Sequence, residues 1–111
     1  MNAVNLPAVI AGYLAAHQAR DVETALTVFT PDAVVRDDGH TYRGTDAIRD
    51  WLAGAGAEYT FTTELIGASQ DDVEHFDVRQ RLEGDFPGGL VDLHYRFTLR
   101  GPAVSELVIE P

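Results

Sequence analysis

Residues 33–51 constrain the fold of this chain more than any other stretch. They read as a short apolar strand, a two-residue turn, a return strand and an amphipathic helix. Asp38 and Gly39 suit the turn because they tolerate the positive φ angles of a two-residue hairpin. Gly44 ends the return strand, and the hydroxyl of Thr45 is placed to cap the helix that follows. The apolar residues of this helix repeat at helical spacing: Ile48, Trp51, Leu52 and Ala55.

The chain before this segment predicts two short helices. The first begins at Pro7, ends near Gln18, and carries one stripe made of Ile10, Tyr13, Leu14 and His17. Asp21 is a suitable N-cap for the second helix. The apolar face of that helix is Val22, Ala25, Leu26 and Phe29. Pro31 is expected to end it, because the residue before a proline is pushed out of the helical region.

From residue 58 onward the pattern alternates with a period of two, which predicts four long strands. The clearest of them has an apolar face made of Val91, Leu93, Tyr95, Phe97 and Leu99. Charged residues occupy its opposite face, and short turns join neighbouring strands into an antiparallel meander. We therefore expect an α+β fold in which three helices cover a strongly twisted sheet of about six strands, with a cavity at one end.

Length and charge limit the classes of function. The 111 residues fit a single domain, 1–111, and the formal net charge of −10 argues against nucleic acid and anionic membranes as partners. The absence of cysteine excludes disulfides, thiolate metal sites and a cysteine nucleophile. No basic, apolar leader begins the sequence, so we expect a cytoplasmic protein.

The order helix, helix, hairpin, helix and four strands resembles the nuclear-transport-factor-2-like (NTF2-like) superfamily. Two runs, 29–35 and 44–51, resemble its SnoaL-like polyketide-cyclase branch more specifically. The resemblance covers nearly the whole chain and implies a cone of three N-terminal helices on a curved, mostly antiparallel sheet. It also makes a homodimer through the sheet face an expectation. The superfamily contains isomerases, cyclases, dehydratases and binding modules, so the fold leaves the function open.

Comparison with the ketosteroid isomerases of this superfamily implies specific roles. Tyr13 matches the tyrosine of their oxyanion hole, and Asp37 matches their general base without a gap. Their third residue, a protonated aspartate, falls on Leu93 here, so an alkyl group stands where those enzymes have a hydrogen-bond donor.

The residues themselves support these roles while leaving structural alternatives open. Alternation places Asp37 on the same face as Val35, where a desolvated carboxylate suits a general base, although it could instead bind the backbone of the hairpin. Tyr13 and His17 lie one helical turn apart, so together they could donate to an oxyanion, or Tyr13 could orient Asp37. Alternatively, Tyr13 is a buried core tyrosine whose hydroxyl finds a partner in the core.

Further residues are candidates for lining a pocket. His40 would act near the mouth of the pocket or be a solvated residue at the edge of the turn. Aromatic walls, or ordinary core, would come from Trp51, Tyr59, Phe61 and Tyr95. Alternating charges on the later strands indicate cross-strand ion pairs or a polar dimer interface rather than a metal site.

The sequence therefore leads to two hypotheses. In the first, the chain is a small enzyme without cofactor or metal that binds an apolar, carbonyl-bearing molecule and uses Asp37 and Tyr13 for isomerisation, cyclisation or dehydration. In the second, it is a non-catalytic ligand-binding or dimerisation module, consistent with the alkyl group at Leu93.

Overall fold

The hairpin around Asp38 and Gly39 has the predicted form in the computed structural model, which describes residues 6–54 and 61–111. Strands β1 (Phe29–Asp37) and β2 (His40–Arg43) pair antiparallel, with Asp37 opposite His40. The φ angles of Asp38 and Gly39 are 52° and 77°, as a turn with two left-handed residues requires. Helix α3 (Gly44–Gly54) follows at once, so Thr45 lies in its first turn, and Ala55 is outside the described residues.

The two N-terminal helices are α1 (Ala8–Gln18) and α2 (Val22–Leu26). Asp21 caps α2 as predicted, because its side chain accepts a hydrogen bond of 3.2 Å from the backbone N–H of Thr24. The prediction that Phe29 continues this helix is wrong. The helix ends earlier because Thr27 and Val28 form a turn, in which the Val28 N–H donates to the carbonyl of Ala25, and Phe29 begins β1 opposite Val104.

The sheet has six strands in the order β2-β1-β6-β5-β4-β3. The long strands are β3 (Phe61–Gln70), β4 (His75–Gly84), β5 (Leu90–Arg100) and β6 (Ala103–Glu110). These four form the predicted antiparallel meander. The pairing of β1 with β6 is parallel, which the sequence did not predict, and its register shifts between Phe29 and Val34, around Pro31. The expected α+β fold with a mostly antiparallel sheet is thus confirmed.

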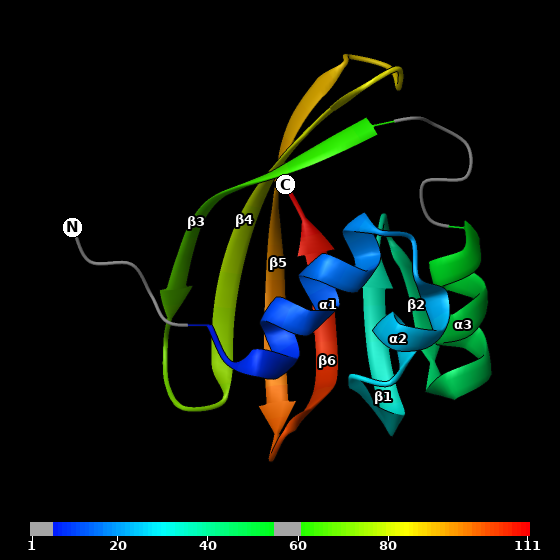
Figure 1. The fold of residues 1–111 in the computed structure, drawn as a ribbon, viewed down its shortest axis with the longest axis vertical. Helices are drawn as coiled ribbons and strands as arrows, with labels where there is room; N and C mark the ends of the chain where they lie inside the picture. The colour runs from blue at the N-terminus through cyan, green and yellow to red at the C-terminus, as the bar shows by residue number, and fades with distance from the viewer. Residues whose placement is uncertain (1–5, 55–60) are drawn as a thin grey trace.

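All three helices lie on one side of the sheet, over β1, β2 and β6, while β3, β4 and β5 curl past them (Figure 1). The core fills the space between the two layers. Its largest fully buried side chains are Tyr13, Phe97, Ile10, Ile48 and Leu107. No helix within the described residues is long and apolar enough to cross a membrane. Beyond the helices, the curled strands enclose space that the core does not fill.

Candidate active site

A cavity of about 890 Å³ opens along the inner face of the curled sheet. Its wall brings together residues that the sequence singled out on separate elements: His17, Asp37, Trp51, Phe61, Leu93 and Tyr95. Carbon makes up much of the remaining lining, including Leu82, Phe86, Pro87, Val91 and Ile109. The cavity therefore combines a large apolar surface with several charged groups, since Arg36, Asp38 and Glu110 also line it. An apolar cavity with convergent polar groups is the usual character of a small-molecule site.

Asp37 shares this wall with two further carboxylates, Asp38 and Glu110. It is the last residue of β1, and it is half-buried on the same face as the fully buried Val35, as the alternation predicts. Its Oδ2 accepts a hydrogen bond of 3.1 Å from Nε1 of Trp51 on α3. The described residues give no hydrogen bond to Oδ1. The indole thus fixes the carboxylate through one oxygen and leaves the other available to a ligand.

Tyr13 lies behind Asp37 on α1, with no exposed surface. Edge-on contacts with the rings of Phe29 and Phe97, at 5.7 and 5.6 Å between centroids, fix its orientation. Its hydroxyl is buried and has no hydrogen-bond partner within the part of the chain that the structure describes. Burial raises the pKa of this phenol well above its usual value, and the nearby Tyr95 and Asp37 raise it further. Tyr13 is therefore a protonated, unused donor at neutral pH.

His17 follows one helical turn after Tyr13, and the two rings stack at 5.6 Å between centroids, as their spacing predicts. Burial lowers the pKa of His17, the charge of Arg20 lowers it further, and Asp37 partly offsets both. The imidazole is consequently neutral near pH 7 and can accept or donate a hydrogen bond at the cavity wall.

His40 does not reach this cavity as the first hypothesis would have it do. His40 is exposed at the outer end of the hairpin, where its ring lies 6.4 Å from that of Tyr42, and it lines neither cavity described here. This position fits the solvated residue that was the alternative for His40. Tyr59 lies outside the described residues.

Gln80 is a residue of this region that sequence reasoning missed. It is 7% exposed on β4, directly opposite Leu93, and therefore lies on the inner face of the sheet. Burial and the charge of Asp37 raise the pKa of Tyr95 to about 12, and the neighbouring Gln80 partly offsets this rise. The available signal was its position between Val78 and Leu82, where a polar residue interrupts an otherwise apolar face.

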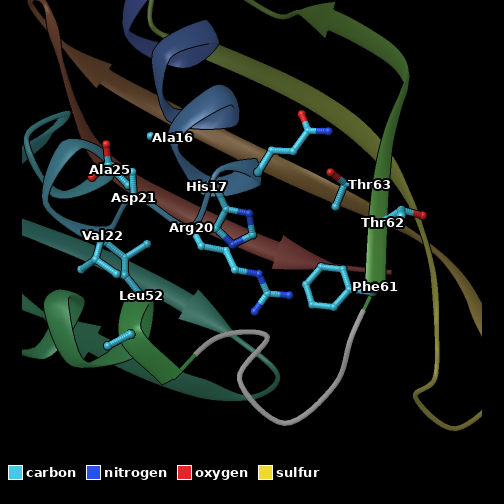
Figure 2. A pocket seen from close by; sticks show the side chains of 12 residues that line it. Ala16, His17, Arg20, Asp21, Val22, Ala25, Leu52, Phe61, Thr62 and Thr63 are labelled. Carbon is cyan, nitrogen blue, oxygen red and sulfur yellow. The ribbon is translucent and has the colours of Figure 1, made fainter.

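A second, smaller cavity of about 320 Å³ lies between α1, α2, the end of α3 and the start of β3. Figure 2 shows the imidazole of His17 and the guanidinium of Arg20 pointing toward Phe61 across it. The guanidinium carbon lies 5.8 Å from the centre of that ring. His17 and Phe61 belong to the walls of both cavities, so they separate the larger cavity from the smaller one.

The outer face of the sheet carries the predicted cross-strand ion pairs. Arg81 binds Asp92 at 2.8 Å, His94 binds Asp77 at 2.9 Å, and Arg96 binds Glu110 at 2.7 Å. Within the described residues, no three His, Asp or Glu side chains are grouped as metal ligands would be.

The sequence profile of the SnoaL-like domain matches residues 10–105 of this chain. A search of curated proteins gave no match. Among solved structures, the chain is 31% identical to a Sinorhizobium meliloti protein named "putative polyketide cyclase", with 95% of each chain covered and a TM-score of 0.89.

A second similar structure is a Catenulispora acidiphila protein with a ketosteroid isomerase-like fold, solved in complex with trimethylamine. It is 18% identical, the alignment covers 96% of this chain and 87% of that one, and the TM-score is 0.83. At this identity the match supports the fold alone.

Proposed function

This chain belongs to the SnoaL-like domain family, and from that premise we propose that it acts on an apolar, carbonyl-bearing small molecule bound in the larger cavity. Asp37 is the general base and Tyr13 the donor to the carbonyl oxygen. The proposed reaction class is a proton transfer next to a carbonyl, which isomerisation, cyclisation and dehydration share. The name of the Sinorhizobium meliloti relative agrees with the cyclisation branch of this class.

One observation carries the proposal: an acceptor in the cavity wall lies close to a buried donor that has no partner among the described residues. Asp37 lines the cavity with one oxygen held by Trp51. Tyr13 offers a hydroxyl with no partner among the described residues, and it lies near enough for the charge of Asp37 to raise its pKa. A buried hydroxyl without a partner costs stability, so a ligand oxygen is a natural partner for it.

In the proposed mechanism each group has one task. Oδ1 of Asp37 takes the proton from the carbon beside the carbonyl, while Trp51 holds Oδ2 and keeps the carboxylate oriented. Negative charge then builds on the carbonyl oxygen, where the Tyr13 hydroxyl stabilises it by a hydrogen bond. Asp37 completes the reaction by returning the proton to another atom of the ligand. The apolar wall strengthens these interactions by excluding water.

The test measures binding of 2-naphthol, a flat apolar molecule whose ionised form imitates an enolate, as a function of pH. In the unchanged protein the carboxylate of Asp37 repels a negatively charged oxygen held nearby. Replacement Asp37→Asn removes that charge, so the affinity for the ionised probe should rise by about tenfold. Fluorescence of Trp51, the single tryptophan and a lining residue of the cavity, reports binding.

The matched control is Asp46→Asn, which removes the same charge from an exposed position on α3. This variant should bind the probe as the unchanged protein does at every pH. If Asp37→Asn leaves the pH dependence of binding unchanged as well, Asp37 has no part in the mechanism.

A non-catalytic binding module is a second candidate, favoured by the alkyl side chain of Leu93 in the cavity wall. Such a module holds its ligand by apolar contact and transfers no proton. Hydrogen–deuterium exchange at the carbon next to the carbonyl of 2-tetralone separates the two functions. An enzyme should accelerate this exchange, and Asp37→Asn should reduce the exchange rate by about 100-fold or more. A binding module should leave the background exchange rate unchanged.

A further inference from the structure

The strand register places a second phenol in the same row as Asp37. Asp37 on β1 is paired with Ile109 on β6, and Ile109 is paired with Tyr95 on β5. Neighbouring strands lie about 4.8 Å apart, so the backbones of Asp37 and Tyr95 are separated by about 10 Å. Both side chains line the same cavity, and only β6 lies between their two strands.

Tyr13 approaches this row from the helix layer. Its ring packs edge-on against Phe97, which lies two residues after Tyr95 on the same face of β5. Tyr95 raises the pKa of Tyr13, and Asp37 raises the pKa of both phenols. Asp37 and Tyr95 thus line the cavity, and the buried Tyr13 lies close enough for both to raise the pKa of its phenol.

Tyr95 is held in a way that suits a donor. It is 3% exposed, and its strand neighbours in register are Val78 and Ile109. Gln80 lowers the pKa of Tyr95, as a group that donates a hydrogen bond to the phenol oxygen does. An amide N–H placed there occupies the oxygen lone pair and leaves the phenol proton free for a ligand.

We propose that Tyr95 is a second hydrogen-bond donor to the ligand oxygen, beside Tyr13. This inference rests on the proposed function and adds a residue to it. A carbonyl oxygen has two lone pairs in one plane, so two phenols can satisfy both. Leu93 and Phe61 flank the cavity with carbon, which fits the apolar remainder of the ligand.

The experiment compares Tyr95→Phe with the unchanged protein, again with 2-naphthol. The variant should bind the ionised probe about tenfold more weakly, because one hydrogen bond to a charged oxygen is lost. The pKa of the bound naphthol, followed by its absorbance, should rise by about one unit in the variant. A purely structural role for Tyr95 would leave that pKa unchanged.

Tyr42→Phe is the matched control. Tyr42 is a partly buried tyrosine that packs near Trp51 at 6.1 Å and lines neither cavity. Its replacement should change neither the affinity nor the pKa of the bound probe. Far-ultraviolet circular dichroism and thermal melting establish that both variants fold.

The outcomes separate this inference from the function on which it rests. If Asp37→Asn and Tyr13→Phe alter the binding of 2-naphthol but Tyr95→Phe matches the Tyr42→Phe control, the second donor is refuted and the proposed function stands. If none of the three replacements changes the affinity or the pKa of the bound probe, both are refuted.

Discussion

Tyr13 shows at the scale of one residue how a site differs from ordinary core. The aromatic ring packs as a core residue does, against Phe29 and Phe97, and it has no exposed surface. The hydroxyl on the same ring has no partner among the described residues. Burial of the ring therefore stabilises the fold, whereas the loss of hydration at the hydroxyl oxygen destabilises it.

Replacement Tyr13→Phe should make the protein more stable and less able to bind. Removal of the unpaired hydroxyl should increase the free energy of unfolding by about 1 kcal/mol, because that group costs roughly 1–3 kcal/mol when it is buried unsatisfied. Urea unfolding measures this gain, and 2-naphthol binding at high pH measures the expected loss of affinity. A loss of stability instead would show that the hydroxyl already has a favourable partner.

At the scale of elements, two glycines occupy opposite backbone environments. Gly12 lies inside α1, whereas Gly39 lies in the hairpin turn with a φ angle of 77°. A methyl group added at either position would meet no atom within 4 Å, so backbone conformation alone decides the effect.

Alanine at these two positions should therefore change stability in opposite directions. Gly12→Ala should stabilise the protein by roughly 0.5–1 kcal/mol, because alanine favours the helix more than glycine. Gly39→Ala should destabilise it by roughly 1–2 kcal/mol, because an L-residue is strained in the left-handed region. Urea unfolding of both variants tests the pair, and equal signs would contradict this account of the turn.

Local signals explain which elements could be predicted from the sequence. The hairpin depends on Asp38 and Gly39 and on the residues next to them, so the pattern shows it directly. The start of β1 depends on pairing between Phe29 and Val104, which lie far apart in the chain, and a helical reading of Phe29 was therefore wrong. Gln80 was missed for a similar reason, since its role depends on Tyr95 across the sheet.

The whole molecule presents two different surfaces to a partner. Helices cover one face of the sheet (Figure 1). The other face carries the ion pairs Arg81–Asp92, His94–Asp77 and Arg96–Glu110. Isolated surface ion pairs contribute little to the stability of a single chain. We propose that this outer face joins two copies of the chain, as the sequence led us to expect.

Sedimentation should accordingly give a mass near twice the 12.1 kDa of one chain. Arg96→Glu should shift the protein toward single chains, because it places a negative charge beside Asp77 and Glu110. Arg49→Glu is the matched control, since it breaks ion pairs with Glu23 and Asp46 on the helical side and should leave the mass unchanged. A mass of one chain for the unchanged protein at all concentrations would exclude the dimer.

The position of β6 between β1 and β5 has a consequence for how the protein is made. Asp37 and Tyr95 are joined through Ile109 on β6, so a ribosome must synthesise β1 to β5 before the strand that joins them. Until then the nascent chain exposes the unpaired edges of β1 and β5. Unpaired apolar strand edges promote aggregation, and the binding site is not yet formed. The addition of β6 thus forms the binding site and covers both aggregation-prone edges in the same step.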